Sequence, residues 1–239
     1  MAHQTVESLT ELPDAYRRWR ASRLGRGTDA LEEDLLLELV GAPEGRRILD
    51  VGCGDGALLA ALAHRGAVAT GVDTDPRMLA AARERARAET LEMTLVEGDA
   101  GALPFPDATF DVVLAVAVLC FVREVERAVT QMARVLKPGG RLVIGELGRW
   151  SLWAAKRRIS GWLGSPTWRA ARFRTEKELT ELIVVAGLTV TAIRGAIYYP
   201  PCGAFAAPLA PVDPWLGRRT MIGAALLAVA GEKPDHPTD

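Results

Sequence analysis

The stretch Ile48-Leu49-Asp50-Val51-Gly52-Cys53-Gly54-Asp55-Gly56 decides the fold of this chain. Its apolar start predicts a strand over 47–51, and the glycine turn leads into a predicted helix over 56–65. Because glycine has no Cβ, such a turn between strand and helix lets a ligand approach the backbone closely. The same letters fit the dinucleotide pattern Gly-x-Gly-x-x-Ala, so the turn predicts a ligand site without choosing the ligand.

Strands and helices alternate after this turn. Four further apolar runs predict strands, and segments of helical spacing predict helices between them. Five strands linked in this way predict right-handed crossovers and a parallel sheet. The predicted strands lie at 47–51, 67–72, 93–97, 110–116 and 141–146. The predicted helices lie at 56–65, from Pro76 onward, and at 125–136.

The two ends of the chain add further elements. Leucines at helical spacing predict a helix over 30–40, which follows a turn at 24–27. Thr175 and Glu178 form a capping-box pattern that opens another helix. That helix is expected to end at Ala186, with two final strands at 188–194 and 222–230 around a loop over 198–215.

The composition is ordinary for a globular protein and disfavours several classes of function. The formal net charge of −1 over 239 residues gives no global field toward nucleic acid. Three cysteines without C-x-x-C spacing and three scattered histidines predict neither a disulfide scaffold nor a metal site. The longest apolar run, 112–122, is far shorter than the roughly 20 residues of a membrane-spanning helix. With no secretory signal pattern, we expect a cytoplasmic protein without a transmembrane segment.

Two carboxylates at the glycine turn favour a cationic ligand. Asp50 precedes the turn and Asp55 lies within it, so both would oppose the pyrophosphate that a dinucleotide places on a helix N-terminus. A sulfonium and an α-ammonium group would suit them, and S-adenosylmethionine (SAM) carries both. The alternative for Asp55 is the N-cap of the following helix.

The next two strands also end in acidic residues. Asp73 stands about 20 residues after the turn, where a carboxylate accepts from both ribose hydroxyls, in SAM or in NAD. Asp99 follows the third strand and is placed to accept from an adenine amino group. Because ligands of open α/β sheets bind at the carboxyl ends of the strands, Asp50, Asp73 and Asp99 are expected at one crevice.

Four stretches together resemble the class I SAM-dependent methyltransferases, in the methyltransferase type 11 and ubiquinone-biosynthesis-like small-molecule group. They are ILDVGCGDGALL, GVDTDPRML, EGDAGALPFPDATFDVVLAVAVLCFV and RVLKPGGRLVIGEL, and they lie within residues 48–147. The resemblance implies a doubly wound, Rossmann-like α/β fold with a seven-stranded sheet of order 3-2-1-4-5-7-6, in which strand 7 is antiparallel. It also implies SAM as cofactor and S-adenosylhomocysteine as product.

The resemblance assigns cofactor contacts residue by residue. Those expected near the methionine part are Asp50, Gly52, Cys53, Gly54 and Val116. Those expected near the adenosine part are Asp73, Thr74, Met78, Asp99 and Ala100. The segment AYRRWRASRLGR resembles a lid over the cofactor, with Tyr16, Trp19 and Arg26 as candidates. For Trp19, packing of a helix on the sheet edge is an equal alternative.

One domain over 1–239 is expected, with four parts. They are N-terminal helices or a lid over 1–45, the SAM-binding core over 46–147, a substrate-side insertion over 148–174 and the C-terminal part of the sheet over 175–231. The insertion is rich in Trp and Arg and has no acid until Glu176. It is interpreted as a lid that also forms the substrate wall. The alternatives are a surface that binds RNA or a membrane and an ordinary helix with a solvated basic face. Substrate contacts are expected from Trp150, Trp153, Tyr198 and Tyr199.

These features predict methyl transfer to a small-molecule acceptor. The alternatives are a protein or RNA methyltransferase, a SAM-binding protein without catalysis and, less favoured, an NAD-dependent oxidoreductase. No general base stands out; Glu146, near the end of the fifth strand, is a weak candidate. The adenine-methylation motif is absent after strand four, so no DNA partner is expected, and a homodimer is left open.

Overall fold

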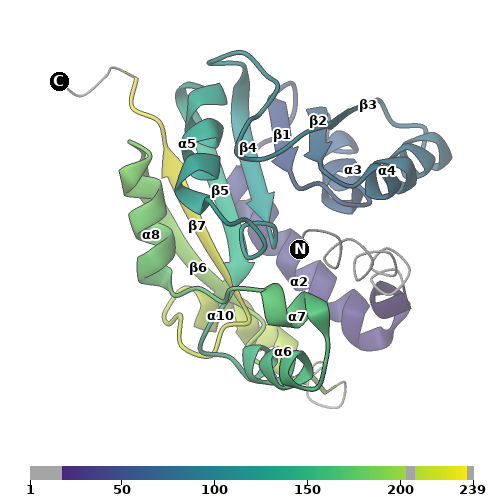
Figure 1. Ribbon diagram of the computed structural model, residues 1–239, viewed down its shortest axis with the longest axis vertical. Helices are drawn as coiled ribbons and strands as arrows, with labels where there is room; N and C mark the ends of the chain where they lie inside the picture. Colours follow the sequence, from purple (N-terminus) through teal and green to yellow (C-terminus); the bar gives the residue numbers. More distant parts are fainter. Residues whose placement is uncertain (1–17, 203–207, 236–239) are drawn as a thin grey trace.

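One mixed sheet organises the chain, and the computed structural model describes residues 18–202 and 208–235 of it. The strands follow the order β3-β2-β1-β4-β5-β7-β6, and β7 is antiparallel to both of its neighbours (Figure 1). The order and the direction of the seventh strand confirm the fold expected from the resemblance. The strands are β1 (Arg47–Val51), β2 (Val68–Asp73), β3 (Met93–Glu97), β4 (Phe110–Val116), β5 (Leu136–Leu147), β6 (Thr189–Ala196) and β7 (Leu226–Glu232).

Helices cover both faces of the sheet, as a doubly wound fold requires. One hydrophobic cluster packs α5 and α8 against one face, and a second packs α2 and α3 against the other. The larger helices are α2 (Arg23–Val40), α3 (Ala57–Ala63), α4 (Pro76–Ala88), α5 (Val125–Val135) and α8 (Glu176–Val185). Within the described residues, none of the helices combines the length and apolar character needed to cross a bilayer.

The central strand β4 explains why the apolar runs lack alternation. Its residues 112–115 are fully buried, because β1 and β5 flank it and helices cover both sides. Asp50 of β1 is in register with Gly71 of β2 and Leu114 of β4. The ends of these parallel strands therefore meet at one edge of the sheet, where the glycine turn lies.

The predicted turn at 24–27 is wrong, because those residues lie inside α2. The Oγ atom of Ser22 caps the helix by accepting a hydrogen bond from the Gly25 amide at 2.9 Å. A Cβ on Gly25 would lie 2.0 Å from the Trp19 carbonyl oxygen. The glycine thus permits a close backbone contact at the helix start, where the sequence suggested a break.

Two other elements differ from the sequence expectation. Strand β5 begins at Leu136 instead of Arg141, because a register shift lets Leu136 pair with Phe110 before the pairing resumes at Arg141. The predicted loop over 198–215 contains a short 3₁₀ helix, η2 (Ala210–Val212), which leads into α10 (Asp213–Gly217). The buried Asp213 carboxylate holds this loop by accepting from the amides of Ile197 and Tyr198.

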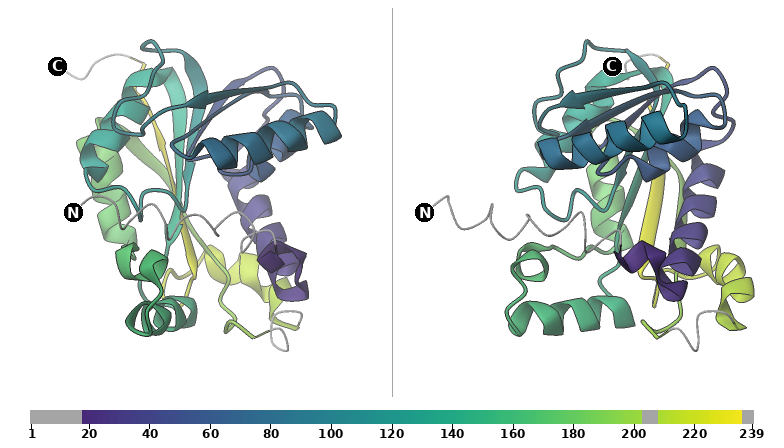
Figure 2. Two further views of the ribbon diagram at one scale, coloured as in Figure 1. Left: turned by 45° about the vertical axis from the view of Figure 1, so that its right-hand side comes forward. Right: turned by 90° about the vertical axis from the view of Figure 1, so that its right-hand side faces the viewer.

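The segment after β5 leaves the sheet and returns to the same point. It forms α6 (Leu152–Trp162) and α7 (Pro166–Ala170), and the Arg174 amide donates to the Leu147 carbonyl at 3.0 Å where it returns. Figures 1 and 2 show α6, α7 and α10 at the end of the molecule where β4 and β5 finish, with the start of α2 beside them. The insertion therefore stands next to the carboxyl edge of the sheet.

Candidate functional site

The glycine turn after β1 is held open by its own backbone. The amides of Gly52 and Cys53 both donate to the Val72 carbonyl, at 2.7 and 3.1 Å. Gly52 and Gly54 have φ angles of 74° and 55°, which favour glycine. A Cβ on Gly52 would lie 2.4 Å from Val118, whereas no atom of the described residues lies within 4 Å of one on Gly54. The turn is thus packed below Gly52 and open at Gly54.

Asp50 provides a buried carboxylate directly before this turn. It is 3 % exposed, and burial first, then the charge of Asp73, raises its pKa to about 7. Among the described residues, no donor forms a hydrogen bond with it. A buried carboxylate without a protein donor fits a cationic group as its ligand, because an unpaired charge there is costly.

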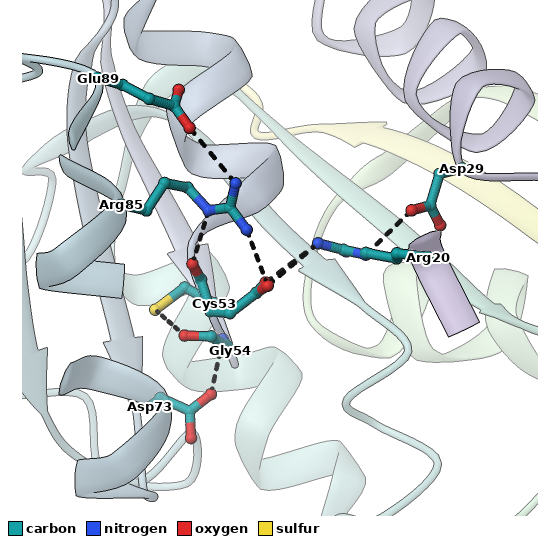
Figure 3. Close-up of polar contacts among 8 residues, drawn as sticks. Arg20, Asp29, Cys53, Gly54, Asp73, Arg85 and Glu89 are labelled. Atoms are coloured by element: carbon teal, nitrogen blue, oxygen red, sulfur yellow. Dashed lines mark hydrogen bonds and ion pairs between the residues drawn. The ribbon is translucent and has the colours of Figure 1, made fainter. Parts of the chain in front are cut away.

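Asp73 connects the end of β2 to the glycine turn. Its Oδ2 atom accepts from the Gly54 amide at 2.9 Å (Figure 3). Its Oδ1 atom accepts from the Asp75 amide, also at 2.9 Å. Asp75, not Asp73, caps α4. Thr74 is exposed and Met78 half-buried at the start of that helix. A carboxylate that is held in place while its remaining lone pairs face outward fits the ribose hydroxyls expected there.

Asp99 and Ala100 follow β3 at the same edge of the sheet. The Gly98 amide donates to the Asp73 carbonyl at 3.1 Å, so the two strand ends adjoin. Asp99 is exposed and its Oδ1 atom accepts from the Gly101 amide at 2.6 Å, while Ala100 is buried. Val116 is half-buried at the end of β4. The three predicted carboxylates thus follow adjacent strands at one edge.

Asp55 does not cap α3, whose N-cap is Gly56 without a side-chain hydrogen bond. Its carboxylate instead pairs with Arg20 at 3.1 Å and Arg85 at 2.9 Å, and Arg85 Nε donates to the Asp55 carbonyl (Figure 3). These two arginines were missed in the sequence analysis. Their charges offset that of Asp55, so Asp50 and Asp73 are the carboxylates left for a cation.

The lid candidates have different surroundings. Tyr16 lies outside the described residues. Trp19 packs against the hydrophobic cluster that contains Trp153 and Tyr199, in line with the packing alternative. Arg26 is exposed and donates to the Ala21 carbonyl of its own segment. Arg20, from the same AYRRWRASRLGR stretch, is the residue that reaches the glycine turn.

Comparisons with known proteins agree with this geometry. The family model described as a methyltransferase domain matches residues 49–144. The ubiquinone biosynthesis O-methyltransferase of Idiomarina loihiensis is 36 % identical over 165 residues, which cover 65 % of this chain and 67 % of that protein. The chain belongs to the class I SAM-dependent methyltransferases. The cofactor of this family is SAM, which agrees with the acidic edge described above.

Other relatives of this methyltransferase match shorter stretches or the fold alone. The demethylmenaquinone methyltransferase of Tropheryma whipplei (strain Twist) is 44 % identical over 110 residues, covering 46 % of this chain and 45 % of that protein. The chain thus matches less than half the length of that relative. A SAM-dependent methyltransferase from Thermotoga maritima, a possible histamine N-methyltransferase, has a TM-score of 0.73 at 23 % identity, covering 95 % and 99 % of the two chains.

The candidate substrate residues of the methyltransferase divide into core and surface. Trp153 Nε1 donates to the Tyr199 carbonyl at 2.9 Å, and the Tyr199 hydroxyl lies 3.0 Å from Thr28 Oγ1. Both rings are buried and tie α6 to α2. Tyr198 is half-buried and donates to the Thr220 carbonyl, and Trp150 is 66 % exposed. Their contact with a substrate stays a prediction.

Glu146 lies beneath the insertion, fully buried at the end of β5. Its Oε1 atom accepts from the Cys120 amide at 3.3 Å, and its Oε2 atom has no hydrogen-bond partner among the described residues. Burial raises its pKa to about 7, which the charge of Arg174 opposes. Burial and Glu146 also raise the pKa of the Cys120 thiol, so that thiol stays protonated. Glu146 is therefore a buried group that titrates near neutrality.

A third carboxylate with a pKa raised to about 7, besides Asp50 and Glu146, lies on α2. Burial first, then the charge of Asp29, raises the pKa of Glu32 to about 7, against the charges of Arg157 and Arg20. The Arg157 guanidinium lies 5.5 Å from the ring centre of Trp153 and 4.9 Å from that of Trp168. Glu32 was not predicted, because its spacing is that of an ordinary exposed helix position. No cluster of His, Cys, Asp or Glu that could hold a metal occurs within 18–202 and 208–235.

Proposed function

We propose that this chain transfers a methyl group from SAM to a small-molecule acceptor. The observation that carries the proposal is Asp50, whose buried carboxylate lacks a protein donor among the described residues and lies beside an open glycine turn. SAM offers an α-ammonium and a sulfonium where that negative charge lies. A dinucleotide would instead bring an anionic pyrophosphate to the same place.

Different residues at the carboxyl edge of the sheet would bind different parts of SAM. Asp50, Gly52, Cys53, Gly54 and Val116 would hold the methionine part, and Asp73, Thr74 and Met78 the ribose. Asp99 and Ala100 would contact the adenine. When bound, SAM supplies an electrophilic methyl group for in-line displacement. The chain then contributes mainly alignment, which is worth on the order of 7–11 kcal/mol in well-oriented reactions.

The acceptor proposed is a small aromatic compound related to quinones. Support comes from the relatives, which are named for demethylmenaquinone and for ubiquinone biosynthesis. The O-methyltransferase relative suggests a hydroxyl acceptor, which must lose its proton on transfer. Glu146 is proposed as the group that takes this proton, because a carboxyl with a pKa near 7 is well matched to that role.

Calorimetry and an activity assay test the proposal in sequence. Binding of S-adenosylhomocysteine, without binding of NADH, is expected first. Methyl transfer from labelled SAM to a panel of hydroxylated quinone precursors is expected next. Binding without transfer to any small molecule would favour a protein or RNA methyltransferase, or a binding protein without catalysis. Binding of NADH would reject the cofactor assignment. The cytoplasmic location and the homodimer stay predictions.

A further inference from the structure

The outward face of α6 is apolar. The helix buries Trp153, Ala154 and Gly161 on its inner side. Its other side exposes large apolar residues at positions that share one helical face, with Trp162 and Leu163 each 83 % exposed. The exposed set on this face is Leu152, Ile159, Trp162 and Leu163. An amphipathic helix on a protein surface normally turns its apolar side inward and its polar side to solvent. An outward apolar face therefore indicates a surface that binds a partner.

A second group of exposed apolar residues adjoins this face. The Gly223 amide donates to the Trp150 carbonyl at 3.0 Å, which joins the two segments. Both Trp150 and Ile222 are more than half exposed, and Trp215 on α10 is 54 % exposed. Figure 2 shows α6 and α10 at the same end of the molecule. The apolar surface therefore extends across two segments that are distant in sequence.

Positive charge accompanies this apolar surface. Between Leu147 and Thr175 the chain has no acidic residue and seven basic ones. Lys156 and Arg169 are exposed beside the apolar face of α6, and Arg158 stacks 5.0 Å from the ring centre of Phe173. Arg158, Trp162 and Arg169 also line an open hollow of about 450 Å³ between α6 and α7. The hollow offers guanidinium and indole groups together.

We propose that this surface, formed by 150–172 and 215–222, docks the protein on the face of an anionic lipid bilayer. Exposed Trp and Leu side chains insert at the boundary of headgroups and acyl chains, while Lys and Arg pair with lipid phosphates. The hollow between α6 and α7 receives one such phosphate. A second copy of this chain fits the surface less well, because it would place Lys156, Arg158 and Arg169 against their own copies.

Docking there gives the acceptor a route to the site, a consequence that rests on the proposed function. Ala154 of α6 and Phe173, which follows α7, pack with Cys120 and Leu147, and the Cys120 amide donates to Glu146. A bilayer in contact with the outer side of these helices lies next to the acceptor side of the sheet edge. The acceptor class is then an apolar compound dissolved in the membrane, delivered without crossing water.

Flotation with lipid vesicles tests the docking surface directly, with the full chain. Vesicles of phosphatidylcholine with added phosphatidylglycerol should carry the protein upward at low salt, and vesicles of phosphatidylcholine alone should not. High salt should weaken the binding by screening the basic residues. The double variant Ile159→Asp/Trp162→Asp should lower the partition coefficient by about tenfold or more. Val185→Asp, an exposed aliphatic position on α8, is the matched control and should bind like the wild type.

Several outcomes would overturn the docking surface. One is the absence of flotation with anionic vesicles; another is equal flotation of the double variant and the wild type. A dimer in light scattering that Ile159→Asp/Trp162→Asp dissociates, without vesicle binding, would assign the face to a second copy. Binding of S-adenosylhomocysteine by calorimetry is measured on the same variants. Its absence in the wild-type protein would reject the proposed function without bearing on the docking surface, and its retention in the double variant shows that a loss of flotation is not a loss of fold.

Discussion

Arg20 Nη1 lies 3.1 Å from Asp55 Oδ1, and this ion pair connects the segment before α2 to the glycine turn after β1. The other Asp55 oxygen lies 2.9 Å from Arg85 Nη2, so one carboxylate links the N-terminal segment, the turn and α4. Arg20 also pairs with Asp29 of α2 at 3.0 Å. Arg20 thereby couples the position of the N-terminal segment to the backbone that faces the cofactor site.

Replacing Arg20 with Gln should weaken binding of S-adenosylhomocysteine moderately. A partly exposed ion pair contributes up to about 1 kcal/mol, so a loss of about fivefold in affinity is expected by calorimetry. Arg26→Gln is the matched control, because Arg26 is exposed and, among the described residues, donates to the Ala21 carbonyl of its own segment. Equal losses for the two variants would show that the coupling through Asp55 has no part in binding.

The pKa of Asp50 makes cofactor binding depend on pH. With a pKa of about 7, the carboxyl is mostly protonated at pH 6 and mostly ionised at pH 8. Affinity for S-adenosylhomocysteine, whose ammonium needs the anion, should therefore rise by about tenfold over this interval. Calorimetry at the two pH values measures the change. In Asp50→Asn the affinity should be low and nearly independent of pH; a variant that keeps the wild-type profile would contradict the assignment.

Asp50→Asn should weaken cofactor binding but raise the stability of the ligand-free protein. Because the folded pKa of Asp50 lies above the unfolded value of 3.8, the wild type loses stability as pH rises from about 4 to 7. Asp50→Asn removes that ionisation and retains the shape. Without ligand, the variant should melt at a higher temperature than the wild type at pH 8, and the difference should shrink toward pH 4. A variant less stable than the wild type at pH 8 would mean that Asp50 has a donor in the fold.

Removing the Asp73 carboxylate should lower the affinity for S-adenosylhomocysteine more than it lowers the stability of the fold. Asp73→Ala leaves the ribose hydroxyls and the Gly54 amide without an acceptor, and such losses cost about 1–3 kcal/mol each. Affinity for S-adenosylhomocysteine should fall by about tenfold to a hundredfold in calorimetry. The control Asp75→Ala removes the N-cap of α4 two residues away, so it should lower the melting temperature and leave affinity nearly unchanged. Unchanged affinity in Asp73→Ala would reject the ribose assignment.

Much of the sheet edge could be predicted, because its pattern is local. The apolar runs, the glycine turn and the acidic residue after each strand all occur within a few residues of one another. Parallel pairing then brings Asp50, Asp73 and Asp99 to one edge. What could not be predicted depends on contacts between distant segments. The stretch 15–26 contains five arginines, and only the fold selects Arg20 as the partner of Asp55, 35 residues later.

The insertion over 148–174 also depends on contacts between distant segments, which could not be predicted. From the sequence, substrate contacts are expected from both Trp150 and Trp153, but Ser151 caps α6, so Trp150 precedes the helix and is exposed. Trp153 is buried because it donates to Tyr199, a residue 46 positions away that no local pattern connects to it. The burial of Glu146 likewise depends on distant residues, because Cys120 donates to it and packs with Ala154 and Phe173. The residues next to Glu146 in sequence, Gly145 and Leu147, do not predict that its side chain is buried.

Glu146→Gln offers the most direct test of acid–base chemistry at the acceptor side. The amide keeps the size of the side chain and can still accept from the Cys120 amide, so the fold should persist. If Glu146 takes the acceptor proton, kcat should fall by about 10²–10⁴, the usual contribution of a general base. The wild-type rate should rise with pH and level off above about 7, since the ionised form is the base. In the variant that rise should disappear, while affinity for S-adenosylhomocysteine is retained.

The matched control is Glu32→Gln, because Glu32 is a carboxyl on α2 whose pKa is likewise raised to about 7. That variant should keep the pH profile of the wild type, even if its stability changes. Stopped-flow transfer of a labelled methyl group separates the chemical step from product release in all three proteins. A Glu146→Gln protein with wild-type kcat would assign this carboxylate to packing between β5 and the insertion. Loss of the profile in both variants would instead point to a shared effect of buried charge, since the two carboxylates lie on different elements, α2 and β5.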